Sequence, residues 1–130
     1  TVFIGQSVGG FAAILYGTYL NVDVVHAISP LTDLSKPEYI FSKHIHAKMI
    51  ESYPNDHFQL SRLLEDLSYE TSINLHFDES YEFDKMHAEF IEKNKNVIHQ
   101  KYPFGKHNLA MELRAKGKLL EIIEQEFENG

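Results

Sequence analysis

The chain has 130 residues with 12 basic and 19 acidic side chains, so its net charge is -7 when the histidines are neutral. Its length and ordinary globular composition suit a single domain spanning residues 1–130. The acidic balance, with no stripe of lysine and arginine, argues against nucleic acid binding. No cysteine is present, which excludes disulfides, a thiol nucleophile and thiolate metal ligands.

No apolar run approaches the roughly 18 residues that a membrane-spanning helix needs. Residues 1–4 lack the positively charged start of a signal peptide. We therefore expect no membrane span and a cytoplasmic location. The chain also lacks an initiator methionine, which leads us to expect that it is a piece of a longer protein.

Residues 2–29 have the pattern of a strand, a helix and a second strand. Residues 2–4 are a short apolar run stopped by Gly5, which is typical of a buried strand. Residues 8–20 carry apolar side chains around most of a helix that Asn21 closes, and residues 22–29 form a valine-rich strand. Together they predict a βαβ unit with parallel strands.

Helices and strands continue to alternate in the rest of the chain. Residues 30–68 hold three of the four prolines and predict a helical, cap-like insertion. Strands are expected at 73–77 and 97–102, and helices at 84–94 and 109–127, the last with a break at Gly117. The pattern predicts an α/β fold, with a mostly parallel sheet of about four strands flanked by helices.

The last of these helices is predicted to be amphipathic. Its apolar face is expected to carry Leu119, Leu120, Ile123 and Phe127. Its acidic residues are expected on a solvated face, and these are Glu121, Glu124, Glu126 and Glu128.

The segment Gly5-Gln6-Ser7-Val8-Gly9-Gly10 matches Gly-x-Ser-x-Gly, with a predicted strand before it and a helix after it. In such a turn the serine backbone is strained and its hydroxyl projects beyond the sheet, so side chains at the flanking Gly5 and Gly9 would collide. Ser7 then lies at a helix N-terminus, where the Val8 N–H can donate to an oxyanion. Gly10 permits close approach of helix and sheet. The alternative is a turn whose serine merely caps the helix.

With this motif in this setting, the sequence resembles the α/β-hydrolase superfamily. The resemblance covers nearly the whole chain, but only the second half of that fold, from the nucleophile strand onward. It implies a serine nucleophile followed along the chain by an acid and then a histidine. It also implies that four strands, and a loop with a second oxyanion donor, precede Thr1, so the isolated segment is expected to be incomplete as an enzyme.

Histidine is the side chain best suited to take the serine proton. His107 lies in a loop after the last predicted strand, and its Gly-x-His-Asn setting resembles the histidine loop of the family. Such a loop lies over the carboxyl edge of the sheet, where Ser7 also projects. An exposed loop histidine without a role is the alternative.

The acid is expected to follow the strand at 73–77. Asp84 is favoured because its distance from that strand suits a loop reaching toward His107, and Asp78 is the runner-up. Asp84 could instead be a helix N-cap. Asp33, after the second strand, is a third position that a minority of the family uses, although a turn after Pro30 also explains it.

Other histidines could bind a metal, but we expect neither a metal nor a cofactor. His44 and His46 would point to different faces of a helix. A second possible metal-binding set combines two sheet residues with histidines nearby, and it consists of His76, Asp78, His87 and His99.

These residues predict hydrolysis of an ester through an acyl-serine intermediate. The alternatives are an O-acyltransferase that acts on a glycan, as in glycan-modifying members of the superfamily, and a hydrolase-like domain that binds without catalysis. The expected partner is a small-molecule or glycan ester, and the unpaired sheet edge could form a homodimer. Side chains of the insertion could line the substrate pocket or pack its own core, and these are Tyr39, Phe41, Tyr53, His57 and Phe58.

Overall fold

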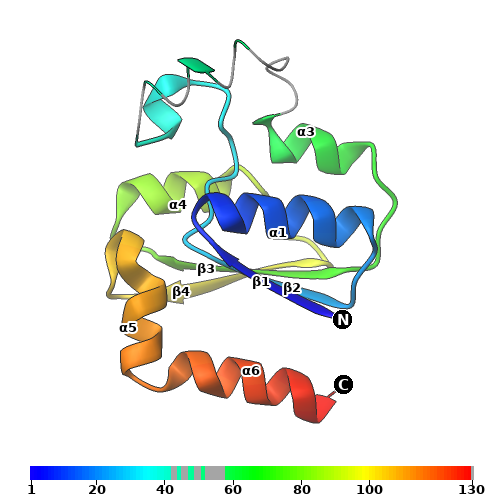
Figure 1. The fold of residues 1–130 in the computed structure, drawn as a ribbon, viewed down its shortest axis with the longest axis vertical. Helices are drawn as coiled ribbons and strands as arrows, with labels where there is room; N and C mark the ends of the chain where they lie inside the picture. The colour runs from blue at the N-terminus through cyan, green and yellow to red at the C-terminus, as the bar shows by residue number, and fades with distance from the viewer. Residues whose placement is uncertain (42–43, 45–46, 49–50, 52–57, 130) are drawn as a thin grey trace.

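The computed structural model describes residues 1–41, 44, 47–48, 51 and 58–129 (Figure 1). Within them, one parallel sheet has the strand order β1-β2-β3-β4. Its strands are β1 (Val2–Gln6), β2 (Val24–Ile28), β3 (Ser72–Asp78) and β4 (Val97–Tyr102). The predicted fold class, an α/β fold with a parallel sheet of about four strands, is confirmed.

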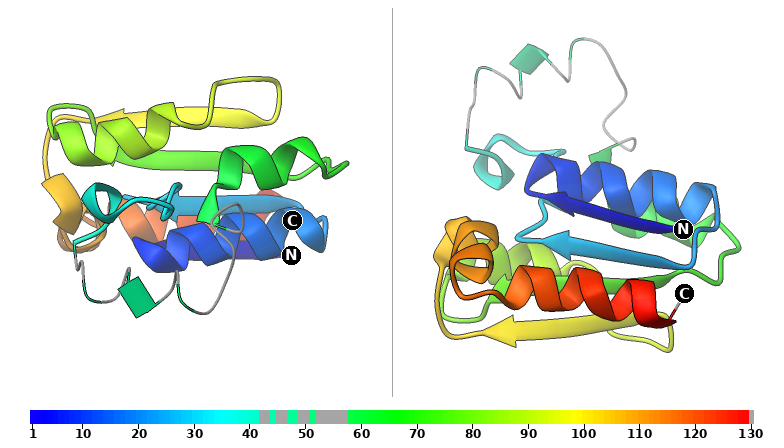
Figure 2. Two further views of the ribbon diagram at one scale, coloured as in Figure 1. Left: turned by 90° about the horizontal axis from the view of Figure 1, so that it is seen from above. Right: turned by 60° about the horizontal axis from the view of Figure 1, so that its bottom comes forward.

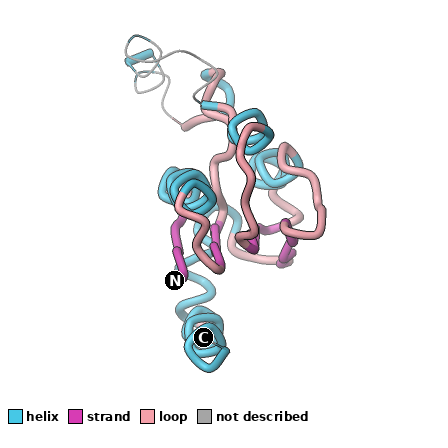
Figure 3. The backbone as a smooth tube through the Cα atoms, turned by 90° about the vertical axis from the view of Figure 1, so that its right-hand side faces the viewer, coloured by secondary structure: helices cyan, strands magenta, loops and turns pink. Residues whose placement is uncertain are grey.

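Helices cover both faces of the sheet. The first face is covered by α1 (Val8–Tyr19), α3 (Leu60–Glu65) and α4 (Glu82–Glu89). Two helices follow the last strand, namely α5 (Leu109–Ala115) and α6 (Lys118–Asn129). Seen from the side in Figure 3, the sheet lies between α1 and α6, and Figure 2 shows α6 running along the second face.

The strands begin and end within about two residues of their predicted limits. The helix predicted at 84–94 is wrong at its end, because α4 covers Glu82–Glu89 and stops before the predicted last turn. Asn21 and Gly117 have left-handed backbones, with φ of 52° and 75°, so they end α1 and separate α5 from α6 as predicted. In the insertion at 30–68, the described residues include the one-turn helix η1 (Pro37–Tyr39) and α3. Residues 42–43, 45–46, 49–50 and 52–57 of the insertion lie outside the described residues.

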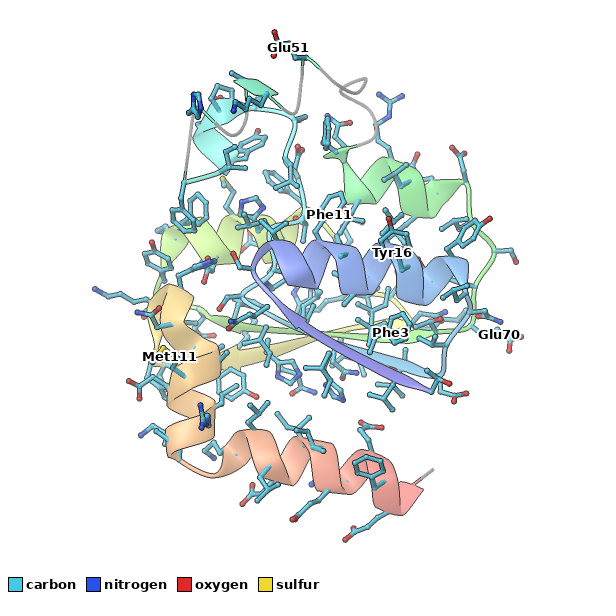
Figure 4. All side chains as sticks on the ribbon, in the orientation of Figure 1. Phe3, Phe11, Tyr16, Glu51, Glu70 and Met111 are labelled. Carbon is cyan, nitrogen blue, oxygen red and sulfur yellow. The ribbon has the colours of Figure 1, made fainter. Side chains whose placement is uncertain are left out.

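The main core fills the space between the sheet and the helices of the first face. Ile14, Val25, Ile73 and Leu75 are all fully buried there. Phe3, labelled in Figure 4, packs against this cluster from the edge strand β1. The core holds α1 in place, and α1 begins at the predicted nucleophile.

The predicted apolar face of α6 is right for Leu119 and Ile123, which are partly buried, and wrong for Leu120 and Phe127. Leu120 and Phe127 are 59% and 81% exposed, whereas Glu126 is partly buried and accepts a hydrogen bond from His26 at 2.8 Å. Residues three and four apart share a helix face, so the face toward the sheet carries Leu119, Ile122, Ile123 and Glu126. A polar partner on β2 therefore fixes the rotation of this helix in place of a purely apolar stripe.

β1 is an edge strand, and its Val2 and Ile4 side chains are 37% and 43% exposed. Formation of a homodimer through this edge stays a prediction, which analytical sedimentation would test. Among the helices of the described residues, none is both long and apolar enough to cross a bilayer.

Candidate active site

The turn between β1 and α1 holds Ser7 in a rare conformation. Its φ is 53° and its ψ is -122°, a region that costs a non-glycine residue roughly 1–3 kcal/mol. The surrounding backbone compensates, because the Ser7 N–H donates to Ile28 and the Ser7 carbonyl accepts from Gly10 and Leu31. The Ser7 side chain makes no helix-capping hydrogen bond, so its hydroxyl is left for another partner.

Glycine is required at two of the three positions expected from the motif. A Cβ at Gly5 would lie 2.2 Å from the carbonyl oxygen of Gly9, and one at Gly10 would lie 2.8 Å from the Pro30 Cβ. A Cβ at Gly9 would meet no described atom within 4 Å, so the expected collision there is wrong. The turn is thus tightly packed at Gly5 and Gly10 and open at Gly9.

A second strained loop carries His107. After β4, Gly105 and Lys106 have φ values of 96° and 48°, and His107 follows in the one-turn helix η3 (Lys106–Asn108). A Cβ at Gly105 would lie 2.8 Å from the Leu109 Cα, so a larger residue would displace the loop. This folded loop brings the imidazole over the carboxyl end of the sheet.

Ser7, His107 and Asp84 form one hydrogen-bonded chain. The Ser7 Oγ lies 2.8 Å from His107 Nε2, and His107 Nδ1 lies 2.8 Å from Asp84 Oδ1. A carboxylate only accepts hydrogen bonds, so Nδ1 carries the imidazole proton and Nε2 is free to accept the serine hydroxyl. The Ser7 hydroxyl therefore points to a nitrogen that can take its proton.

Asp84 is fully buried in the first turn of α4, whose N-cap is Tyr81 and not Asp84. Its Oδ2 atom has no hydrogen-bond partner among the described residues. A buried carboxylate with one unpaired oxygen is costly, and a positive neighbour offsets that cost. The pair with His107 is thus most favourable when the imidazole is protonated.

Asp78 is the runner-up for the acid. Its carboxylate bonds to the backbone of the loop that carries His107 and not to the His107 side chain. Its Oδ2 accepts from the Lys106 N–H at 2.9 Å, and its Oδ1 accepts from the Ser80 N–H and hydroxyl. Burial raises the pKa of the Asp78 carboxyl, but these hydrogen bonds and the nearby Lys106 charge outweigh burial and lower it overall. Asp78 is therefore ionised, and its carboxylate holds the backbone of Lys106, the residue that precedes His107.

The remaining polar candidates have other partners. Asp33 forms a turn in which its Oδ1 accepts from the Ser35 N–H at 2.9 Å, which confirms the turn interpretation. The possible metal-binding set is not assembled, because His76 bonds to His26, His87 to Thr32, His99 to Ile91 and Asp78 to Ser80. The described residues contain no group of three or more potential metal ligands. His44 is exposed, and His46 lies outside the described residues.

The candidate pocket residues of the insertion have different surroundings. Phe41 is 59% exposed, and its ring meets His107 edge-on with ring centroids 4.6 Å apart. Phe58 is buried in the main core, so for this residue the packing interpretation holds. Tyr39 is half-buried beside His87, while Tyr53 and His57 lie outside the described residues.

Comparison with known proteins relates this chain to one solved fold. No family model matches the chain, and no curated protein matches it by sequence. The structure is similar to the crystal structure of a lipase-esterase related protein from Clostridium acetobutylicum, with a TM-score of 0.51 and 17% sequence identity. The match covers 95% of this chain and 65% of that protein. The chain thus shares its fold with part of a lipase-esterase related protein.

In this fold the carboxyl ends of parallel strands and the start of the following helix meet at one edge. Ser7 lies where β1 ends and α1 begins, and Val8 is the first residue of α1. The Val8 N–H therefore has no acceptor within the helix and lies at the positive end of its dipole. A hydroxyl, an imidazole, a buried carboxylate and a free amide together can perform acyl transfer.

Two residues near the site were not expected from the sequence. Phe83, next to Asp84, packs between Phe41 and His87. His87 accepts a hydrogen bond from the Thr32 N–H and donates one to the Tyr39 carbonyl. The available signal was weak, because an apolar or histidine side chain in a helix more often belongs to the core.

Proposed function

We propose that this chain carries the catalytic residues of a serine hydrolase of the α/β-hydrolase type that acts on carboxylic esters. The observation that carries the proposal is the continuous chain of two 2.8 Å hydrogen bonds from Ser7 through His107 to Asp84. The shared fold with a lipase-esterase related protein supports it. In this proposal, residues 1–130 are part of a single hydrolase domain, and residues 30–68 are its substrate-covering insertion.

The first half-reaction forms an acyl-enzyme. His107 Nε2 removes the Ser7 proton while the Ser7 oxygen bonds to the ester carbonyl carbon. The carbonyl oxygen becomes negative and accepts a hydrogen bond from the Val8 N–H. The bond to the alcohol oxygen then breaks, and His107 returns the proton to that oxygen. Asp84 keeps the imidazole in the required tautomer and offsets its positive charge.

The second half-reaction repeats these steps with water. His107 takes a proton from water, the hydroxide bonds to the acyl carbon, and the Ser7 oxygen leaves and regains its proton from His107. The products are a carboxylic acid and an alcohol. The geometry is already in place before substrate binds, which reduces the cost of reorganisation in the transition state.

Labelling of the full-length protein with a fluorophosphonate probe tests this proposal. We expect covalent labelling at Ser7, loss of labelling in Ser7→Ala, and unchanged labelling in the control Ser68→Ala, which alters a loop serine before β3. Ester hydrolysis should be lost in parallel. Folded protein that never labels would overturn the proposal in favour of a binding domain, and labelled protein that passes the acyl group to a sugar hydroxyl but not to water would reassign it as an acyltransferase.

A further inference from the structure

The surroundings of His107 identify which part of an ester would lie next to them. In the proposed reaction, His107 Nε2 must reach the alcohol oxygen in order to protonate it. The alcohol portion of the substrate therefore lies against the side chains that border the imidazole. The residues that border the imidazole therefore affect binding of the alcohol portion more than binding of the acyl portion.

The border is aromatic and open on its outer side. Phe41 lies 4.6 Å from His107 and 4.5 Å from Phe83 between ring centroids, and Phe83 lies 6.3 Å from His107. More than half of Phe41 is nevertheless exposed, at 59%. An aromatic ring that packs on one side and faces solvent on the other is costly to hydrate and gains from an apolar ligand.

The backbone segment that precedes Phe41 is held in place by hydrogen bonds to the buried side chain of His87. His87 Nδ1 accepts from the Thr32 N–H at 3.0 Å, and His87 Nε2–H donates to the Tyr39 carbonyl at 2.8 Å. The first of these bonds requires a neutral imidazole, since Nδ1 must accept. Burial lowers the pKa of His87, although the Tyr39 carbonyl and nearby carboxylates partly oppose this. The segment leading to Phe41 is thus fixed to α4, the same helix that supplies Asp84.

We propose that Phe41, backed by Phe83, is a specificity residue that binds an apolar alcohol portion of the ester substrate. The preferred substrate class is then a carboxylic ester whose alcohol carries an alkyl chain or ring. This inference rests on the proposed ester hydrolysis. It differs from a purely structural role for Phe41, in which the ring would only orient His107.

Two isomeric esters separate the sides of the scissile bond. Hexyl acetate and ethyl hexanoate have the same atoms, but hexyl acetate places its chain on the alcohol side. We expect kcat/KM of the full-length protein to be at least about tenfold higher for hexyl acetate than for ethyl hexanoate. Each methylene that is buried against Phe41 makes the binding free energy more favourable. Equal values, or a preference for ethyl hexanoate, would overturn the inference.

Substitution of Phe41 locates the preference. Phe41→Ala should lower kcat/KM for hexyl acetate at least about fivefold more than for ethyl acetate, mainly through KM. Phe41→Leu should give an intermediate loss, and Tyr19→Ala, which removes an exposed aromatic ring at the far end of α1, should change neither. An equal loss for hexyl acetate and ethyl acetate would show that Phe41 positions His107 and would overturn its role in specificity.

The outcomes also separate this inference from the proposed function. An enzyme that labels at Ser7 and hydrolyses both isomers equally retains the proposed function and loses the inference alone. A protein that neither labels at Ser7 nor hydrolyses any of the three esters loses both.

Discussion

At the carboxyl end of the sheet His107 donates to Asp84, and on the face covered by α6 His26 donates to Glu126, both at 2.8 Å. Both histidines are thereby fixed in one tautomer by a carboxylate. The two pairs also have similar positions in the fold, because each joins a histidine in or after a strand to an acid on a helix. The distance between histidine and acid alone does not distinguish a reactive site from a structural one.

The other nitrogen of each histidine makes the difference. His107 Nε2 meets the hydroxyl of Ser7 on a strained turn at a helix N-terminus. His26 Nδ1 instead accepts from His76 Nε2–H at 2.9 Å, and His76 Nδ1 accepts from the Tyr102 hydroxyl. When both histidines are neutral, this second chain has one consistent order of donors, from Tyr102 to Glu126, because Glu126 can only accept. It ends at the partly buried Tyr102 and Glu126 and contains no serine hydroxyl, so we assign it a structural role.

The largest expected effect on the turnover number comes from disrupting the pair of His107 and Asp84. Asp84→Asn should lower the turnover number by at least about a hundredfold, because a neutral amide cannot offset the imidazolium and can favour the wrong tautomer. Steady-state ester hydrolysis by the full-length protein measures this. The control Asp66→Asn, an exposed residue after α3, should leave turnover unchanged. Normal turnover in Asp84→Asn would remove Asp84 from the mechanism.

The histidines under α6 should affect how the free energy of unfolding depends on pH. Burial, and then the charge of His26, lower the pKa of His76 from 6.5 to about 3. The unfolded chain thus binds a proton on His76 between about pH 6.5 and 3 that the folded chain does not bind, so stability falls as pH falls through this window. The loss should be on the order of 2–4 kcal/mol. Thermal unfolding between pH 7 and pH 4 measures it.

His76→Gln should make this pH dependence shallower, because glutamine retains hydrogen bonding but does not titrate in the window. It should not abolish the dependence, since burial also lowers the pKa of His87. The control His44→Gln, at an exposed position, should leave the dependence unchanged. An unchanged dependence in His76→Gln would show that this buried chain is not the source of the acid sensitivity.

The contrast between the two histidine pairs also shows what the sequence could predict. The proximity of Ser7 and His107 was predictable because local rules place them: a strand and a helix flank the Gly-x-Ser-x-Gly turn, and a loop with Gly105 follows the last strand. The strand pattern was equally local, since apolar runs of the right length alternate with helical spacing. These features depend on a few neighbouring residues.

Features that depend on packing between distant segments were harder to predict. Asp78 ends β3 and Asp84 follows it in α4. Their hydrogen-bond partners differ: Asp78 accepts from the Lys106 N–H, and Asp84 accepts from His107. Glu126 was expected to be solvated, because the rotation of α6 against the sheet depends on His26, a hundred residues earlier in the chain. Hydrophobic spacing alone does not encode such a polar contact.

A smaller effect on activity is expected from loosening the histidine loop. Asp78→Asn removes the charge that receives the Lys106 N–H, and a shift of the loop would misalign His107. We expect about a tenfold lower turnover number with little change in KM. Slower labelling by the fluorophosphonate probe should accompany it, because that reaction also needs the Ser7–His107 alignment. A loss as large as that of Asp84→Asn would instead place both carboxylates in direct contact with the reaction.

The smallest effect is expected from the carboxylate of the second pair. Glu126→Gln should lower the free energy of unfolding by about 1 kcal/mol or less, because a glutamine oxygen can still accept from His26 and Glu126 is partly exposed to solvent. Turnover should stay within about twofold, since this pair contacts no reacting group. Denaturant unfolding and ester hydrolysis measure the two quantities, and Glu124→Gln, an exposed acid on the same helix, is the matched control. If Glu126→Gln lowered turnover as strongly as Asp84→Asn, the histidine chain under α6 would be coupled to the reaction, and the structural role assigned to it would be wrong.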